Sequence, residues 1–178
     1  MLPVERPGRR ATFVLPAEHL RAGGLVARAT RAYHSQRAVA FTETLSSGLG
    51  RTLVTRWQLE RPNRLTYRIR GGSQAIVIGK RRWDRPTAAG KWVPSPQLPV
   101  QQPVPLWWQG RITNAYVLDS TPATIEVSFL DRDGPAWFTA TFDRRTLLPK
   151  HVQMVATAHF MTQKYAPSAR PVAIRPPR

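Results

Sequence analysis

The sequence contains no cysteine, and this absence excludes several kinds of site within its 178 residues. Disulfide bonds, thiolate catalysis, cysteine-based zinc sites and lipid attachment through an N-terminal cysteine all need a thiol. No apolar run approaches the roughly 18 residues that a membrane-spanning helix requires. The first ten residues also lack the apolar segment of a signal peptide. We therefore expect either a cytoplasmic protein or a soluble piece of a longer exported or membrane-tethered one.

Acidic residues are scarce as well. Ten Asp and Glu stand against 27 Lys and Arg, which gives a formal net charge of +17. Arginine supplies 23 of the basic residues, and 17 residues are proline, a bias that is typical of GC-rich genomes. We interpret most of this charge as solvated surface. A charge of this size still attracts anions such as nucleic acid, anionic lipid headgroups or acidic proteins.

Catalytic motifs are missing too. The sequence has no G-x-S-x-G nucleophile motif and no glycine-rich phosphate loop before a helix. The carboxylate pair Asp131 and Asp133 sits in an Asp-Arg-Asp-Gly turn, where Asp is favoured for backbone reasons. No set of residues recommends an enzyme, so we predict a non-enzymatic protein that uses no cofactor.

The four histidines give only a weak metal hypothesis. His151 and His159 share one face of a predicted strand but would lie about 27 Å apart, too far to bind one ion. His159 and Met161 would be neighbours on one strand face, and a His/Met pair suits copper(I). The alternative is that both are ordinary sheet residues.

The pattern of apolar residues predicts the elements. Residues 1–17 are rich in Pro and Arg and are expected to form an extended arm, while helical spacing predicts one amphipathic helix at about 18–36. A helical turn is expected at residues 105–108. Further on, the period changes to two and predicts strands near residues 39–45, 53–60, 64–70, 75–78, 80–85, 90–94, 112–119, 123–131, 135–143 and 148–161.

The balance of strand and helix predicts the fold class. Short connections favour neighbouring antiparallel strands. A helix of 18 residues is only about 27 Å long and cannot cover the apolar face of eight or more strands. We therefore predict a mainly β (α+β) domain over residues 18–177, with a single strongly curved antiparallel sheet, a half-barrel, wrapped around one or two helices. Such a sheet encloses either a packed core or an apolar cavity.

Two segments resemble a known family. The string Trp57-Gln-Leu-Glu-Arg-Pro-Asn-Arg-Leu-Thr-Tyr67 resembles the "RP-x-R-hydrophobic" hairpin of LolA-like lipoprotein carriers and the related LppX/LprG-type lipid-binding lipoproteins. The ending Tyr165 … Arg170-Pro-Val-Ala-Ile174 is similar to the terminal pattern of that family. The order of elements over residues 18–177 fits as well. The resemblance implies an extracytoplasmic half-barrel whose apolar cavity holds acyl chains, and a structural role for Arg61-Pro62 and Arg64.

The favoured hypothesis is therefore a non-enzymatic binding module in the periplasm or at the cell surface, which holds a lipid or another apolar ligand. It is also a candidate soluble domain of a longer membrane-associated protein. Basic residues at the cavity rim, Arg56, Arg68 and Arg81, would attract anionic headgroups or an anionic membrane surface. The inward strand faces are predicted to line the cavity with Phe41, Leu45, Leu53, Trp57, Tyr67, Ile69, Ile76, Ile78, Phe129 and Phe138.

Two alternatives remain from other classes. The charge of +17 allows a nucleic-acid-binding protein, and the His159/Met161 pair allows a periplasmic copper-linked module. A stacking platform for single strands needs aromatics and arginines on one exposed face. Arg64 and Arg68 instead alternate with Tyr67, so nucleic acid is the less favoured partner. The sequence gives no prediction of the oligomeric state.

Overall fold

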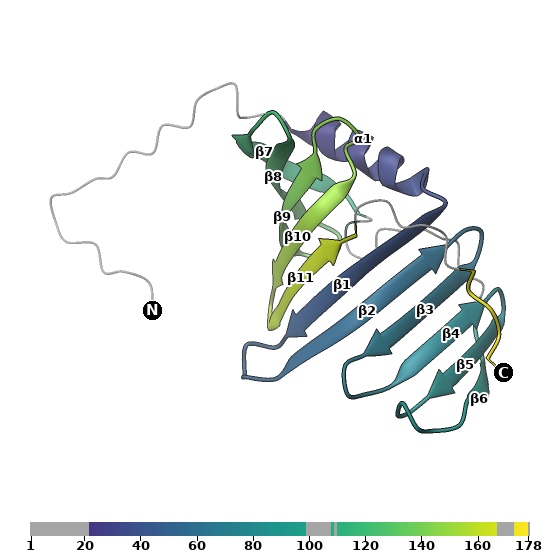
Figure 1. Ribbon diagram of the computed structural model, residues 1–178. Helices are drawn as coiled ribbons and strands as arrows, with labels where there is room; N and C mark the ends of the chain where they lie inside the picture. The colour runs from purple at the N-terminus through teal and green to yellow at the C-terminus, as the bar shows by residue number, and fades with distance from the viewer. Residues whose placement is uncertain (1–21, 99–107, 109, 167–172, 178) are drawn as a thin grey trace, which may run out of the picture.

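The computed structural model describes residues 22–98, 108, 110–166 and 173–177 (Figure 1). The predicted arm, residues 1–17, and most of the helical turn predicted at 105–108 lie outside the described residues. Within the described part, no helix is both long enough and apolar enough to cross a membrane.

The helix α1 (Gly23–His34) is shorter than the predicted 18–36. Its N-cap, Ala22, offers no side-chain oxygen, and the Ala22 N–H donates instead to the carbonyl of Ala115 on a neighbouring strand. Val26, Ala29 and Tyr33 are buried. Their spacing of three and four residues puts them on one stripe of the helix, which faces the sheet.

The sheet contains eleven antiparallel strands. Their bounds are β1 (Ala38–Ser46), β2 (Thr52–Glu60), β3 (Arg64–Ile69), β4 (Gln74–Ile78), β5 (Arg81–Arg85), β6 (Val93–Pro96), β7 (Ile112–Ser120), β8 (Thr124–Asp131), β9 (Ala136–Asp143), β10 (Pro149–Ala156) and β11 (His159–Tyr165). The strand order is β6-β5-β4-β3-β2-β1-β11-β10-β9-β8-β7. Two meanders of consecutive strands therefore join into one sheet where β1 pairs with β11.

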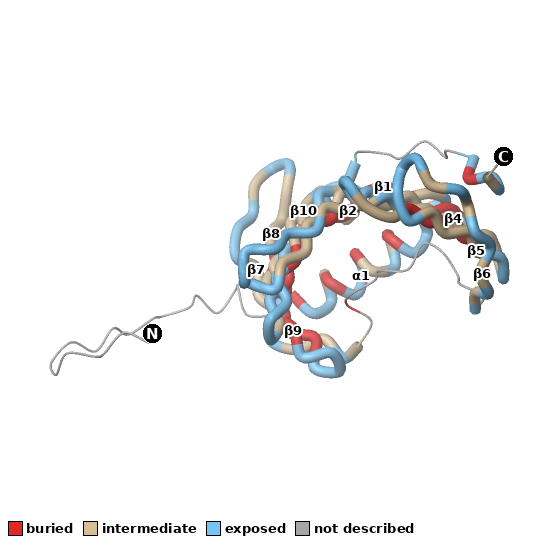
Figure 2. The backbone as a smooth tube through the Cα atoms, turned by 90° about the horizontal axis from the view of Figure 1, so that it is seen from below, coloured by how far each residue is buried: buried red, intermediate tan, exposed pale blue. Residues whose placement is uncertain are grey.

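The sheet is strongly curved, and α1 lies on its concave side (Figure 2). We call this side the inner face and the opposite side the outer face. The sheet is open, because β6 and β7 pair on one side only. The predicted fold class, a curved antiparallel half-barrel around a helix, is confirmed.

The prediction of a single strand over residues 148–161 is wrong, because two strands, β10 and β11, occupy this region. The chain reverses between β10 and β11 at Thr157 and Ala158, where Ala158 has a positive φ of 56°. Alternation of apolar residues continues through this turn, so periodicity alone does not reveal it. The Asp131–Gly134 turn between β8 and β9 is confirmed.

The core forms two clusters. The larger cluster lies between α1 and the strands β7–β11, and Trp108, Phe129 and Phe138 pack at its centre with ring centroids 5.2–6.0 Å apart. Trp108 also donates from Nε1 to Thr30 Oγ1 of the helix at 3.0 Å. The smaller cluster consists of Tyr33, Val39, Phe41 and Leu59, with Trp57, Leu65 and Tyr165 packed against it.

The two segments that resemble the carrier family meet in space. Arg64 donates from Nη1 to the carbonyl of Ile174 at 2.7 Å, and the Ile174 N–H donates to Glu60 Oε2 at 3.3 Å. Arg61 donates to the carbonyl of His34 at the end of α1. The C-terminal segment therefore lies on the outer face (Figure 2), and the structural role expected of Arg61 and Arg64 is confirmed.

We predict that Arg64→Ala detaches the C-terminal segment. The variant removes a charged donor from the Ile174 carbonyl, and the free energy of unfolding should fall by about 1–2 kcal/mol. Urea unfolding measures this loss, and hydrogen exchange of the Ile174 amide should accelerate. Arg81→Ala, at an exposed position on β5, is the matched control and should change neither quantity. Unchanged protection of the Ile174 amide in Arg64→Ala would contradict the prediction.

Candidate functional site

A row of aromatic side chains crosses the inner face. The strand register aligns Tyr165 of β11 with Phe41 of β1, Trp57 of β2 and Tyr67 of β3. Successive ring centroids along this row lie 5.0, 6.1 and 5.1 Å apart. Tyr33, from the last turn of α1, meets Tyr165 edge-on at 6.1 Å. Because cross-strand neighbours point to the same side of a sheet, these rings form one continuous surface.

Burial changes along this row. Tyr33 and Phe41 are buried at the helix end, whereas Trp57 and Tyr67 are only half-buried. Leu65 and Ile69, which flank Tyr67 on the inner face of β3, are half-buried as well. The aromatic surface is therefore closed next to α1 and accessible over β2 and β3.

A buried polar network lies beside the aromatic row. Gln163 donates from Nε2 to Glu43 Oε2 at 2.8 Å and accepts the hydroxyl hydrogen of Tyr165 at 2.7 Å. Trp57 donates from Nε1 to the other Glu43 oxygen at 3.3 Å. Glu43 and Gln163 are 4% and 1% exposed, so their polar atoms depend on these partners. Burial raises the pKa of Tyr165 well above its ordinary value, and Tyr33 and Glu43 raise it further.

The Tyr33 hydroxyl stands apart from this network. It is buried and has no hydrogen-bond partner among the described residues. Burial raises the pKa of Tyr33, which keeps the hydroxyl protonated and available as a donor. The aromatic cluster therefore contains one buried, neutral hydroxyl that the described residues leave without a hydrogen-bond partner.

The far end of the inner face is polar. Arg82 and Asp84 on β5 form an ion pair at 2.8 Å, and Ser95 donates to Asp84 at 2.7 Å. Arg82 also donates to the Tyr67 hydroxyl at 3.1 Å. The hydrogen bonds from Arg82 lower the pKa of Asp84, and this carboxylate in turn raises the pKa of Arg82. The aromatic row thus ends in a charge pair that is neutral overall.

The predicted cavity residues divide into three groups. Trp57, Tyr67 and Ile69 share the accessible part of the inner face, Phe41 lies on this face but is buried, and Leu45 and Leu53 lie on it near the β1–β2 turn. Phe129 and Phe138 are also inward but are fully buried beneath α1 and Trp108, where they form packed core.

The prediction that Ile76 and Ile78 point inward is wrong. Their cross-strand partners on β3 are Thr66 and Arg64, which lie on the outer face. Ala75 and Val77 take the inner positions instead. Residues 75–78 are continuously apolar, so the sequence contains no alternation that could set the phase of this strand.

The predicted rim arginines also lie on the outer face. Arg56 and Arg68 are direct cross-strand partners, and Arg81 pairs with Ile78 on the same side. Because inward and outward side chains alternate, Arg68 points away from the aromatic row that contains Tyr67. The predicted separation of arginines from aromatics is therefore confirmed for this strand, and the arginines do not border the aromatic surface.

Arg56 and Arg68 instead line a groove of about 510 Å³ on the outer face. The groove crosses β11, β1, β2 and β3 between two rows of outward side chains. One row contains Lys164, Thr42, Arg56 and Arg68, and the other contains Ala166, Ala40, Gln58 and Thr66. The remaining lining residues, Tyr165, Phe41, Trp57 and Tyr67, lie between the two rows, and their side chains point to the inner face.

The weak metal candidates are poorly placed for joint binding. Met161 is buried in the larger core cluster, whereas His159 is exposed and its Nδ1 lies 3.1 Å from the carbonyl oxygen of Thr157. The predicted separation of 27 Å between His151 and His159 is also wrong, since the chain reverses between them and leaves roughly 17 Å. Across the described segments, no three His, Asp or Glu side chains gather as metal ligands.

Asp131 and Asp133 serve the turn, as predicted. Asp131 accepts backbone N–H groups of Gly110 at 3.1 Å and Asp133 at 3.0 Å, and Asp133 accepts that of Arg111 at 2.9 Å. Both carboxylates are therefore engaged with the backbone.

Sequence reasoning missed the polar network and the Arg82–Asp84 pair. Glu43 stands two residues after Phe41 in an alternating strand, so its parity places it on the inner face. The sequence therefore contains a signal for the inward position of Glu43. The pairing of Glu43 with Gln163 depends on the contact between β1 and β11 and has no local signal.

The fold matches solved structures. Neither a protein-family model nor a curated protein matches the sequence. LprF from Mycobacterium bovis matches with a TM-score of 0.57 at 11% identity, over 89% of this chain and 99% of that chain. Two weaker matches are the LolA superfamily protein NE2245 from Nitrosomonas europaea and MucB, solved in complex with MucA(peri). NE2245 matches with a TM-score of 0.34 at 9% identity, over 82% of this chain and 91% of that chain. MucB matches with a TM-score of 0.43 at 11% identity, over 88% of this chain and 60% of that chain.

The architecture and the match to LprF define the class of fold. The chain has a LolA-like fold, an open antiparallel half-barrel with a helix in its concave side. In particular it shares this fold with LprF over nearly the whole length of that protein. The resemblance noted from the hairpin and the C-terminal segment is thereby confirmed at the level of fold.

We predict that Gln163→Leu destabilises the protein by about 2–4 kcal/mol. The substitution removes the hydrogen bond that Glu43 Oε2 accepts and the oxygen that accepts from the Tyr165 hydroxyl, and a buried polar group that loses such a bond costs roughly 1–3 kcal/mol. Chemical unfolding measures the effect. Gln153→Leu, at an exposed outer position on β10, is the control and should change stability little. Equal stability of the two variants would show that the network is not formed.

We predict that Asp84→Asn lowers stability by its full amount above about pH 4 and by progressively less at lower pH. The lowered pKa of Asp84 means that its contribution is present above the ordinary value of 3.8 and is lost as the pH falls through the folded-state pKa. The ion pair is half-exposed, so the loss at pH 7 should be about 0.5–1 kcal/mol. Unfolding curves at several pH values test this, with the exposed Asp119→Asn as control. A deficit at pH 2–3 as large as the one at pH 7 would contradict this account.

Proposed function

We propose that this protein is a non-enzymatic extracytoplasmic module that holds a lipid or another apolar ligand against the inner face of its sheet. The accessible aromatic row carries the proposal, because Trp57 and Tyr67 stay half-buried beside half-buried Leu65 and Ile69. Ligand sites are typically concave and apolar with a few polar groups that fix orientation. The Arg82–Asp84 pair is such a polar group at the far end of the surface.

The fold supports this proposal in a second way. The half-barrel shared with LprF holds α1 on its concave side, and Trp57 and Tyr67 stay half-buried on that side. The resemblance to LolA-like and LppX/LprG-type proteins implies acyl chains as the ligand and an extracytoplasmic location. We take residues 18–177 as the binding domain and residues 1–17 as an arm that leads to it.

We predict that Tyr67→Ala weakens binding of a fluorescent long-chain acyl probe about tenfold. Tyr67 offers a half-buried ring in the middle of the accessible surface, and losing its contact should cost roughly 1.4 kcal/mol. Probe fluorescence on delipidated protein measures the affinity, and native mass spectrometry of the protein after incubation with a lipid extract provides a second readout.

Ile76→Ala is the matched control, since it removes apolar surface from the outer face of the adjacent strand. It should leave probe affinity unchanged. Circular dichroism establishes that both variants are folded. The proposal fails if the parent protein takes up neither the probe nor any apolar adduct, or if Ile76→Ala loses as much affinity as Tyr67→Ala.

A further inference from the structure

The outer face carries an exposed apolar stripe. Val155 of β10 pairs with Trp137 of β9 on one side and with Phe160 of β11 on the other. These three side chains are 51%, 46% and 45% exposed. Leu49, in the β1–β2 turn next to Phe160, is 89% exposed. A cluster of large apolar side chains that the fold does not bury marks an interaction surface.

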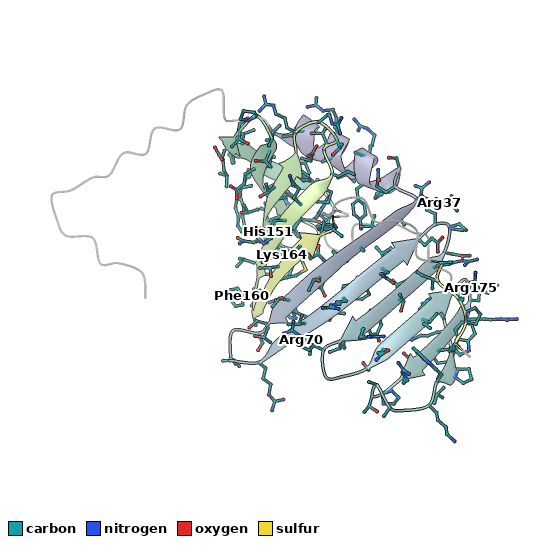
Figure 3. The ribbon with its side chains drawn as sticks, in the orientation of Figure 1. Arg37, Arg70, His151, Phe160, Lys164 and Arg175 are labelled. Atoms are coloured by element: carbon teal, nitrogen blue, oxygen red, sulfur yellow. The ribbon has the colours of Figure 1, made fainter. Side chains whose placement is uncertain are left out.

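A basic row runs parallel to this stripe. The register aligns Lys164 of β11 with Thr42 of β1, Arg56 of β2 and Arg68 of β3. Lys164 and Phe160 are four residues apart on one strand, so they share the outer face at a separation of about 13 Å. Figure 3 looks onto this face and shows Phe160 and Lys164 on β11 beside His151 on β10.

Nothing in the fold explains why Arg56 and Arg68 lie directly opposite each other on β2 and β3. Like charges directly opposite each other on adjacent strands destabilise a sheet. Among the described residues, neither Arg56 nor Arg68 takes part in an ion pair. Both line the groove of about 510 Å³ together with Lys164. They also line a second cleft of about 380 Å³, to which Arg70 and the Gly71-Gly72 turn contribute. Bound anions would relieve this repulsion.

We propose that the outer face docks onto an anionic lipid bilayer. Trp, Phe and aliphatic side chains favour the boundary between headgroups and acyl chains, so the stripe would sit at that depth. Arg56, Arg68 and Lys164 then contact lipid phosphates, in agreement with the net charge of +17. A nucleic-acid platform would instead interleave aromatics with arginines, whereas here the two rows are separate.

This surface goes beyond the proposed ligand site, because it lies on the opposite side of the same strands. Ligand binding and membrane docking therefore depend on different residues. Tyr67→Ala should leave vesicle binding unchanged, while substitutions of the outer arginines should leave uptake of the acyl probe unchanged. Failure of one proposal can thus be told from failure of the other.

The first test measures binding of the full chain to phosphatidylcholine vesicles with and without phosphatidylglycerol. We expect binding that requires phosphatidylglycerol and weakens with salt. The double variant Arg56→Gln/Arg68→Gln should weaken it roughly thirtyfold. The control Arg28→Gln/Arg31→Gln removes the same charge from exposed positions on α1, on the other side of the sheet, and should have less than a threefold effect.

The second test uses the absence of cysteine in the chain. Val155→Cys, labelled with a polarity-sensitive fluorophore, should shift to the blue when phosphatidylglycerol vesicles are added. The same label at Arg28→Cys on α1 should not shift. Since both positions are exposed, neither substitution should disturb folding.

Three results would overturn the proposal. The first is no binding to phosphatidylglycerol vesicles by the folded parent protein. The second is an equal loss of binding in the two double-arginine variants, which would show that only total charge matters. The third is binding to single-stranded DNA that depends on Arg56 and Arg68 without any shift of the label at position 155, which would assign this face to nucleic acid.

Discussion

The pairing of β1 with β11 is the contact on which the whole structure depends. Every other strand pairs only with its neighbours in sequence, whereas this ladder joins residues 41–46 to 160–165. It turns two meanders into one curved sheet. It also brings Gln163 beside Glu43 and Tyr165 beside Phe41, so the polar network and the aromatic row exist only because this ladder forms. The candidate site is therefore built from both ends of the chain.

The same ladder keeps two chemically different faces apart. The side-chain period in a strand is two, so a slip of one residue between β1 and β11 would exchange the faces. Glu43 would then point outward, and the aromatic row would be broken at Tyr165. The buried hydrogen bonds of Gln163 oppose such a slip, because they are made in one register only. In this way a polar network inside an otherwise apolar surface specifies the alignment that separates the aromatic face from the basic one.

Local patterns predicted most of the strands and much of the site. Alternation in residues 64–70 placed Tyr67 inward and Arg68 outward, as observed. The continuous apolar run 75–78 contained no such information, and the faces of Ile76 and Ile78 were assigned wrongly. The reversal at Ala158 was missed because apolar alternation continues through it. The strand order and the Glu43–Gln163 pair could not be predicted, since they depend on contacts between residues about 120 positions apart.

The shortage of helix explains why an accessible apolar surface remains on the inner face. The twelve residues of α1 span about 18 Å, while eleven strands spaced by about 4.8 Å cover more than twice that width. Val26 and Ala29 pack into the larger cluster, and only Tyr33 reaches the smaller one. The rings of Trp57 and Tyr67 lie beyond it and stay half-buried. A longer helix would stabilise the domain by covering these rings, and it would also remove the surface on which the proposed ligand binds.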